Sequence, residues 1–312
     1  MRLVFMGTPA FAVPSLEGLV DAGHQIAAVV TQPDRPKGRG GRPAPSPVKE
    51  AALRRGLSVW QPERVREPGV VAALAGLHPE AIIVVAFGQI LPRDILLLPP
   101  AGCINVHASL LPRYRGAAPI HWAVINGEKE TGVTTMFMDE GLDTGDIILQ
   151  AAIPIGPDDN VGLVHDRLAH LGSELLLRTL ELVAAGKAPR LPQDPALATY
   201  APLLRPEDEI IDWKRPATAI KNLVRGMDPW PGARTTLDGK VLKIWRVRVV
   251  EDVRAEATPG QILAADEARG ILVRTGDGVV AIETLQAAGG KRLDSRAFLR
   301  GHRLPVGAVM GT

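Results

Sequence analysis

Runs of apolar residues in the first part of the chain alternate with stretches of helical periodicity. The β-branched and aromatic run at 2–6 ends at a glycine, a helical pattern follows at 15–20, and a second apolar run occupies 24–31. The continuous apolar run at 81–86 is typical of a central parallel strand that is buried on both faces. Strands and helices that alternate in this way predict an α/β fold, which we expect to be a doubly wound, Rossmann-like and mostly parallel sheet.

Polar residues occur at regular positions in the next predicted strand. The segment 102–116 reads G-C-I-N-V-H-A-S-L-L-P-R-Y-R-G, and its first half places Cys103, Asn105 and His107 on one side of a strand. Buried amide and imidazole groups cost free energy unless they are used, so this pair is a candidate site. Ligands of open α/β sheets bind beyond the carboxyl ends of the strands, so we expect the loop at 87–92 to form an adjacent wall.

A carboxylate-rich loop separates two further predicted strands. The runs at 132–138 and 146–155 have no helix between them, which predicts an antiparallel strand at the edge of the sheet. The loop that joins them reads M-D-E-G-L-D-T-G-D, with glycines that permit tight turns. Our working hypothesis is that Asn105, His107 and Asp143 converge on one reacting group.

The pattern changes in the last third of the chain. Five prolines between 189 and 206 mark a connector, and a helix is expected at 216–226. Several short apolar runs follow, and the dipeptides Asp238-Gly239 and Asp277-Gly278 between them are hairpin signals. They predict a small C-terminal β-barrel of OB type, a fold often used to bind nucleic acid. We therefore expect a catalytic domain at 1–188, a linker at 189–207 and a C-terminal domain at 208–312.

A basic, proline-rich segment lies within the first predicted domain. Residues 32–47 hold five prolines, three glycines and four basic side chains, so we expect an irregular, mobile insert loop with no regular element. The whole chain carries a net charge of +2, but residues 209–312 alone hold 17 Lys and Arg against 12 Asp and Glu. Two basic regions on a nearly neutral protein are consistent with a polyanionic partner, and equally with an ordinary solvated surface.

The sequence disfavours several classes of protein. It contains no run of eighteen apolar residues, so we expect no membrane span, and it starts with a strand where a signal peptide would need a cleavage region. The single cysteine, Cys103, fits a reducing cytoplasm. Residues 7–12 read G-T-P-A-F-A rather than G-x-G-x-x-G, which argues against an NAD site.

The residues alone narrow the chemistry that is open to the polar strand. A serine hydrolase is disfavoured because no G-x-S-x-G motif occurs, and we expect Cys103 to be a small buried residue rather than a nucleophile. A metal site from His107, Asp143 and Asp146 is conceivable but weak, with one imidazole among scattered carboxylates. Acyl transfer without a covalent intermediate fits best, with Asn105 as an oxyanion donor, His107 as a second donor or proton shuttle, and Asp143 orienting the imidazole.

Several motifs carry a resemblance that covers essentially the whole chain. They are N-V-H at 105–107, S-L-L-P-R-Y-R-G at 109–116, L-D-T-G at 142–145, G-T-P at 7–9, T-Q-P-D-R-P at 31–36, P-S-P-V-K at 45–49 and P-W-P-G-A at 229–233. In these motifs the chain resembles the 10-formyltetrahydrofolate-dependent formyltransferases. The basic insert resembles that of the members that act on methionyl-tRNA, whereas glycinamide ribonucleotide formyltransferases lack both the insert and a second domain.

The resemblance implies a reaction and a set of residues. A formyl group would pass from 10-formyltetrahydrofolate to the α-amino group of methionine on initiator methionyl-tRNA, for translation initiation. Asn105 and protonated His107 would stabilise the oxyanion, and Asp143 would hold His107. The residues expected to line the folate site are Phe87, Gly88, Gln89, Ile90, Leu91, Ser109, Leu110, Leu111, Pro112, Asp139, Glu140, Gly141 and Leu142. Those expected to contact tRNA are Arg35, Lys37, Arg39, Arg42, Lys240, Lys243 and Arg246.

The resemblance leaves two alternatives open. One is another formyltetrahydrofolate enzyme, either a sugar-nucleotide formyltransferase or a hydrolase, which would share the two-domain plan but would not be expected to carry the basic insert. The other is a non-catalytic RNA-binding module, which would leave the polar strand unexplained. For the protein itself we expect a cytoplasmic monomer that uses no metal and no NAD.

Overall fold

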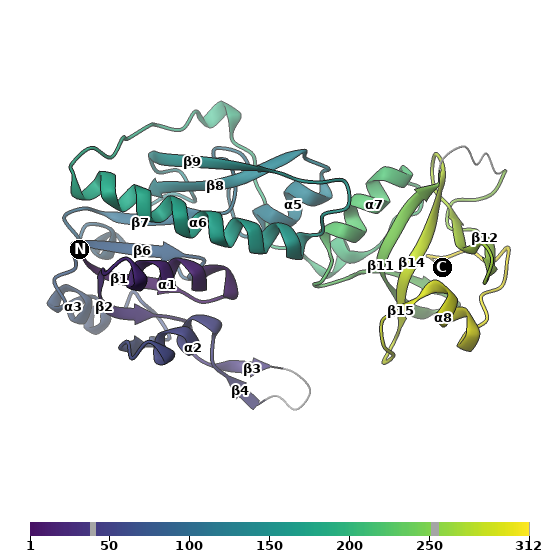
Figure 1. The fold of residues 1–312 in the computed structure, drawn as a ribbon, viewed down its shortest axis with the longest axis horizontal. Helices are drawn as coiled ribbons and strands as arrows, with labels where there is room; N and C mark the ends of the chain where they lie inside the picture. Colours follow the sequence, from purple (N-terminus) through teal and green to yellow (C-terminus); the bar gives the residue numbers. More distant parts are fainter. Residues whose placement is uncertain (38–41, 251–255, 312) are drawn as a thin grey trace. The chain divides into compact units, whose positions relative to one another are not determined.

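The computed structural model describes residues 1–37, 42–250 and 256–311. Its contacts divide the chain into two compact units. The first unit comprises Met1–Pro119, Glu130–Pro154 and His165–Ala201, and the second comprises Ile120–Lys129, Ile155–Val164 and Pro202–Thr312. Figure 1 colours the chain from purple at the N-terminus to yellow at the C-terminus. The domain boundaries expected from the sequence stay a prediction.

A seven-stranded sheet forms the centre of the first unit. Its strands are β1 Arg2–Gly7, β2 Gln25–Val30, β5 Val59–Trp60, β6 Ala81–Val85, β7 Cys103–His107, β8 Glu130–Phe137 and β9 Ile147–Pro154. They lie in the order β5-β2-β1-β6-β7-β8-β9. The strands from β5 to β7 are parallel, whereas β8 is antiparallel to both β7 and β9. The predicted mostly parallel sheet is confirmed, and so is the antiparallel pair of strands at its edge.

Helices cover both faces of this sheet (Figure 1). The helices of the first unit are η1 Ala10–Ala12, α1 Val13–Asp21, α2 Pro47–Arg54, α3 Pro68–Gly76, α4 Arg93–Leu96, most of α6 Val161–Ala184 and η2 Pro195–Leu197, whereas α5 Pro119–Ile125 falls almost wholly in the second unit. On one face α6 approaches the sheet so closely that a Cβ added at Gly172 would lie 3.1 Å from Val106 Cγ1. Ser173 Oγ, on the same helix, donates a hydrogen bond to Pro14 O of α1 at 2.8 Å.

The opposite face of the sheet carries the candidate site. Cys103 packs there in a buried cluster with Val84 of β6 and Ile95 of α4. Because successive side chains of a strand point to opposite faces, Asn105 and His107 share the face of Cys103. The predicted alternation therefore places both polar side chains on the side of the sheet that α3 and α4 cover.

The basic insert contains regular structure that the sequence did not predict. Strands β3 (Arg35–Lys37) and β4 (Arg42–Ala44) pair antiparallel, with Pro36 opposite Pro43. Our expectation of a wholly irregular loop is wrong for these residues. In an antiparallel pair, alternate residues direct their backbone groups away from the partner strand, so proline at such a position removes no hydrogen bond between the strands.

Side-chain contacts fix the base of this hairpin. Lys49 Nζ lies 2.7 Å from Asp34 Oδ2, and Gln61 Nε2 donates to Asp34 Oδ1 at 2.7 Å. These hydrogen bonds, first that from Lys49 and then that from Gln61, hold the pKa of the Asp34 carboxyl below its usual range. Ser46 caps α2 by accepting from Lys49 N, and its Oγ lies 2.7 Å from Thr31 Oγ1. Both ends of the hairpin are therefore tied to the folded unit.

An antiparallel sheet forms the second unit. Its strands are β10 Ala233–Leu237, β11 Lys240–Val250, β12 Ile262–Asp266, β13 Gly270–Arg274, β14 Val279–Ala287 and β15 Leu293–Asp294. They lie in the order β10-β11-β14-β13-β12, with β15 beside β14. Helices α7 (Ala217–Gly226) and α8 (Ser295–Gly301) pack on this sheet, and η3 (Pro206–Glu209) precedes them. The predicted small C-terminal β-domain is confirmed.

The segment 307–311 links the two outermost strands of this sheet. Ile262 N of β12 donates to Ala308 O, and Gly311 N donates to Thr236 O of β10, each at 2.8 Å. The segment thus takes the place of a further strand between β12 and β10. Hydrogen bonds on both of its sides give the sheet the barrel-like closure that an OB-type domain needs.

No helix within the described ranges is long and apolar enough to cross a membrane. The same ranges hold no group of three or more His, Cys, Asp and Glu side chains placed to bind a metal ion.

Candidate active site

Strand β7 holds Asn105 and His107 at the carboxyl end of the parallel sheet. Both are buried, with 8% and 6% of their surface exposed. The His107 Nε2 atom lies 3.0 Å from Tyr114 O. A carbonyl oxygen can only accept a hydrogen bond, so Nε2 must carry the proton and donate it. Nδ1 is then the ring nitrogen left for chemistry, and it faces Asp143 Oδ2 at 3.7 Å.

Asp143 is held in place by its backbone and by a hydrogen bond to its carboxylate. Its φ of 54° is in the left-handed region, which is uncommon outside glycine and which aspartate tolerates better than most residues. Gly116 N donates to Asp143 Oδ2 at 2.8 Å. Gly116 itself has a φ of 116°, and a Cβ there would lie 2.8 Å from Ala201 O. The aspartate therefore has a fixed position opposite His107.

Asn105 differs from its neighbour in lacking a protein partner. Within the described residues, the Asn105 side-chain amide makes no hydrogen bond, and its polar atoms are not among the fully enclosed ones that lack a partner. The amide is therefore unpaired and still accessible, so it can donate to a ligand group. The structure thus pairs His107 with Asp143 and places Asn105 two residues away on the same face of β7.

The predicted folate residues of the first loop are only partly accessible. Phe87 and Leu91 are buried in the core, with 2% and 6% of their surface exposed. The Gln89 side chain accepts from Val65 N at 2.7 Å and donates to Pro62 O at 3.2 Å, so it stabilises the loop. Gly88 has a φ of 83°, and Ile90 is 90% exposed. Among these side chains, that of Ile90 is therefore the most open to a ligand.

The second predicted set, Ser109, Leu110, Leu111 and Pro112, follows β7 in a rigid turn. Ser109 Oγ donates to Arg113 O at 2.7 Å, and Leu111 N donates to Thr134 Oγ1 at 3.1 Å. Gln150 Nε2 donates to Leu111 O at 2.8 Å. Since these polar groups are occupied by protein partners, the turn is built to keep its shape.

The third predicted set, Asp139, Glu140, Gly141 and Leu142, lies in the loop that carries Asp143. The Asp139 carboxylate accepts from Gly141 N at 3.0 Å and from Thr144 Oγ1 at 2.7 Å. Glu140 pairs with Arg93 Nε of α4 at 3.6 Å, which brings this loop close to the first one. Leu142 is 61% exposed. Two exposed apolar side chains, Leu142 and Ile90, therefore come from the two loops that this ion pair connects.

The predicted tRNA contacts of the insert fall partly outside the described residues. Arg39 is among residues 38–41, which are not described. Lys37 and Arg42 are placed by their backbones at the end of β3 and the start of β4. The Arg35 side chain is 69% exposed and lies 3.8 Å from Glu63 Oε2. The insert thus offers at least one well-exposed guanidinium.

The predicted tRNA contacts of the second unit all lie on β11. A bulge between Ile244 and Arg246 changes the alternation of the strand, so Lys243 and Arg246 share the outer face despite their odd spacing. The Lys243 Nζ donates to Pro231 O at 2.6 Å. Arg246 is 71% exposed and lies 2.8 Å from Glu283 Oε2. Lys240 is exposed at the start of the strand.

Two residues outside the predicted set contact the loops of the site. Arg115 is 4% exposed, and its guanidinium donates to Gln193 Oε1 through Nη2 at 2.7 Å. Gln193 Nε2 in turn donates to Asp143 O and to Gly145 O. Sequence reasoning assigned Gln193 to a linker, and no periodic pattern connects it with a residue 50 positions away. For Arg115, the only sequence feature that pointed to the site was its place in the R-G pair that follows Tyr114.

The thiol of Cys103, at the start of β7, has no catalytic role in this arrangement. It is 1% exposed, and Sγ donates to Ile95 O at 3.5 Å. Burial raises the pKa of the thiol to about 12, so it stays protonated near neutral pH. The prediction of a small buried residue is confirmed.

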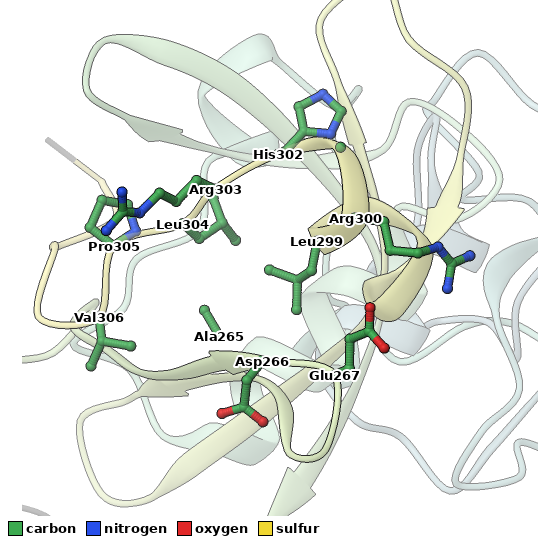
Figure 2. A pocket seen from close by; sticks show the side chains of 11 residues that line it. Ala265, Asp266, Glu267, Leu299, Arg300, His302, Arg303, Leu304, Pro305 and Val306 are labelled. Atoms are coloured by element: carbon green, nitrogen blue, oxygen red, sulfur yellow. The ribbon is translucent and has the colours of Figure 1, made fainter.

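A cavity of about 660 Å³ lies in the second unit, away from these residues in the chain. Figure 2 shows side chains from β12, α8 and the segment after α8 around it. Its wall carries the acids Asp266 and Glu267 together with the bases Arg300 and Arg303. Charges of both signs do not select one class of ligand, and no residue predicted for the site lines this cavity.

Comparison with known proteins identifies the family. The family model described as Formyl transferase matches residues 1–180, and the one described as Formyl transferase, C-terminal domain, matches residues 203–303. The chain belongs to the formyl transferase family. Among curated relatives, the Methionyl-tRNA formyltransferase of Pelotomaculum thermopropionicum is 59% identical over 311 residues, covering 100% of this chain and 99% of that protein. That of Moorella thermoacetica is 54% identical over 311 residues with the same coverage.

Solved structures of the formyl transferase fold are more distant in sequence. HypX from Aquifex aeolicus in complex with tetrahydrofolic acid is 19% identical, with a TM-score of 0.66 over 99% of this chain and 50% of that one. The N-formyltransferase from Helicobacter canadensis, in complex with folinic acid and dTDP-3-aminofucose, is also 19% identical. Its TM-score is 0.66 over 90% of this chain and 99% of that one. At these identities the likeness shows the fold.

Proposed function

We propose that this family member transfers the formyl group of 10-formyltetrahydrofolate to the α-amino group of methionine on initiator methionyl-tRNA. The observation that carries the proposal is the pair of His107 and Asp143, beside Asn105, at the carboxyl end of β7. Relatives named Methionyl-tRNA formyltransferase, 59% and 54% identical over the whole chain, support the acceptor. Tetrahydrofolic acid and folinic acid, named with two solved structures of this fold, support a folate donor.

In the first step the amine attacks the formyl carbon, a C–N bond forms, and the carbonyl oxygen becomes an oxyanion. Asn105 offers the N–H groups of its side-chain amide to this oxygen. His107 offers a second donor at Nδ1 when that atom is protonated. The 3.7 Å from Nδ1 to Asp143 Oδ2 is longer than a hydrogen bond, so the Nδ1 proton is not committed to the carboxylate.

In the second step the bond from the formyl carbon to N10 of the folate breaks. The amine loses one proton and N10 gains one, and His107 with Asp143 can carry it between them. A free α-amino group titrates at about pH 7.7–8.0, so part of the nucleophile is neutral at pH 7. Positioning and oxyanion stabilisation therefore matter most, and one lost donor costs about 2.7–4 kcal/mol of transition-state stabilisation.

The basic surfaces supply contacts for the tRNA. The hairpin β3–β4 carries Arg35, Lys37 and Arg42. Arg39, which the resemblance to the family directs to the acceptor end of the tRNA, lies between its strands in the sequence, outside the described residues. The outer face of β11 carries further basic residues for the phosphate backbone. Neither surface is needed by an enzyme that acts on a small sugar nucleotide.

One experiment tests the donor and the acceptor together. The purified protein is mixed with 10-formyltetrahydrofolate and methionyl-tRNA, and formylmethionine is measured by mass spectrometry after release from the tRNA. Parallel reactions replace the methionyl-tRNA by an amino-sugar nucleotide or omit the acceptor and measure free formate. We expect formylmethionine in the first reaction. Turnover confined to the sugar nucleotide or to formate release would overturn the proposal.

A further inference from the structure

Gln193 connects the two loops that hold the partners of His107. Its Nε2 group donates to Asp143 O at 2.9 Å and to Gly145 O at 2.8 Å. Its Oε1 accepts from Arg115 Nη2 at 2.7 Å and from Arg115 Nε at 3.2 Å. The orientation of the amide follows from these partners, because two carbonyls require donors and a guanidinium requires an acceptor. All the hydrogen-bonding groups of this side chain are therefore used.

The two loops matter because each supplies a group to the catalytic pair. Tyr114 O, next to Arg115 in the chain, accepts the Nε2 proton of His107. Asp143, whose carbonyl Gln193 binds, faces Nδ1 of the same ring. Gln193 thus connects the loop that contacts Nε2 of the imidazole with the loop that faces Nδ1.

The backbone of Asp143 needs such support. A φ of 54° is uncommon outside glycine, although aspartate tolerates it better than most residues, so hydrogen bonds to the loop backbone help to fix it. Gly145, the other residue whose carbonyl Gln193 binds, is closely packed, since a Cβ there would collide with Phe137 O. The segment that carries Gln193 is itself fixed, because Arg115 N donates to Thr199 O at 2.8 Å and Ala201 N donates to Arg115 O at 2.7 Å.

We infer that Gln193 is a positioning residue that sets the geometry of Asp143 against His107 through the bridge Arg115–Gln193–Asp143. The inference rests on the proposed function, since it concerns the same reaction. It assigns a role in the chemistry to a proline-rich segment that the sequence presents as a connector.

The decisive substitution is Gln193→Glu. A glutamate has the same shape and keeps an acceptor for Arg115, but it places an oxygen without a proton against Asp143 O and Gly145 O. We expect kcat to fall by about 10- to 100-fold, the loss typical of a small misplacement of a catalytic group, with KM for both substrates changed less than about 3-fold. Gln193→Ala should lose at least as much.

The matched control is Asp194→Ala. Asp194 is the next residue in the same segment, and it also loses a side-chain hydrogen bond, that from Ala196 N at 2.9 Å. Within the described residues, Asp194 makes no hydrogen bond or ion pair with the Asp143 loop, so kcat should stay unchanged in Asp194→Ala. Thermal melting of all variants checks that they fold. If Gln193→Ala does not fold, Gln193→Glu decides.

A double-mutant cycle separates positioning from general support. In the Asp143→Asn background, a residue that acts through Asp143 has little left to lose, so adding Gln193→Glu should lower kcat by less than about 3-fold. The same factor in both backgrounds would overturn the inference, as would unchanged kcat in Gln193→Glu. These outcomes are distinct from failure of the proposed function, in which the unaltered protein forms no formylmethionine.

Discussion

Strand β7 of the first unit and strand β11 of the second both carry polar side chains on one face, but they use them differently. On β7 the polar pair is buried, with 8% of Asn105 and 6% of His107 exposed. On β11 the Arg246 side chain is 71% exposed and shares Glu283 with Arg248. Buried polar groups must each have a partner or a use, whereas exposed charges are solvated at little cost. The effect of a substitution on β7 should therefore depend on the exact placement of the buried side chain. On β11 it should depend on how many positive charges remain.

The largest effect is expected from the buried pair. Asn105→Ala removes one oxyanion donor and His107→Ala removes the second together with the proton carrier, so each should lower kcat by about 100- to 1,000-fold. Steady-state formylation of methionyl-tRNA measures the loss, with thermal melting as a check on the fold. Normal turnover in either variant would contradict the proposed mechanism. It would also show that β7 is no more sensitive to substitution than β11.

A smaller loss of activity is expected from a substitution at Gly116, whose backbone N–H donates to the Asp143 carboxylate. Gly116→Ala places a Cβ 2.8 Å from Ala201 O at a φ of 116°, so we expect about 1–3 kcal/mol of lost stability and a reduced kcat. Gly186→Ala is the matched control, because its φ is 65° with no atom within 4 Å of the added Cβ. A denaturant titration and kcat measured on both should separate them. Equal kcat in the two variants would contradict the support of Asp143 by Gly116.

A graded effect is expected on β11. Arg246→Ala should leave kcat unchanged and raise KM for methionyl-tRNA severalfold at low salt. The slope of log KM against log salt should fall by about 0.7–0.9 for each phosphate contact that is lost. Arg269→Ala is the control, since Arg269 belongs to the same unit and also has an acidic partner at 2.8 Å, Asp266. An unaltered slope in Arg246→Ala would show that this face does not bind phosphate.

The smallest effect is expected at Cys103, the first residue of β7. Its folded-state pKa of about 12 lies above the ordinary value, so the folded protein retains the thiol proton where the unfolded chain has lost it. The contribution of the Cys103 thiol to the free energy of unfolding is fully present below the unfolded pKa. It decreases as the pH rises from about 8.5 toward 12. Iodoacetamide at pH 8 should leave the native protein unlabelled and active. Rapid labelling without unfolding would show that the face of β7 is open to solvent.

Much of the fold could be predicted because its signals are local. The alternation in β7 placed Asn105 and His107 on one face, and the uninterrupted runs gave the parallel strands. The Asp-Gly dipeptides at 238–239 and 277–278 marked turns of the second sheet, where Asp238 indeed has a φ of 50°. Each of these signals depends on residues that are close together in the sequence.

What could not be predicted depends on distant contacts or on a competing rule. The bonds of Gln193 to Asp143 and Gly145 follow no period. The closure of the second sheet by 307–311 uses backbone groups, which leave no trace in residue identity. In the insert, the rule that proline excludes regular structure failed because Pro36 and Pro43 pair with each other. The roles of the folate and tRNA residues stay predictions, and burial leaves the side chains of Phe87 and Leu91 little surface to offer a ligand.

The pairing of Pro36 with Pro43 also has a consequence for self-association. A short two-stranded hairpin that projects from a protein offers two unprotected edges to any other extended chain. At the position where each strand of this hairpin turns its backbone outward, proline supplies no N–H, so a third strand finds no donor there. The insert can therefore carry its positive charge into solvent without acting as a template for aggregation. Replacing both prolines by threonine should preserve the hairpin but make the protein prone to form β-rich oligomers.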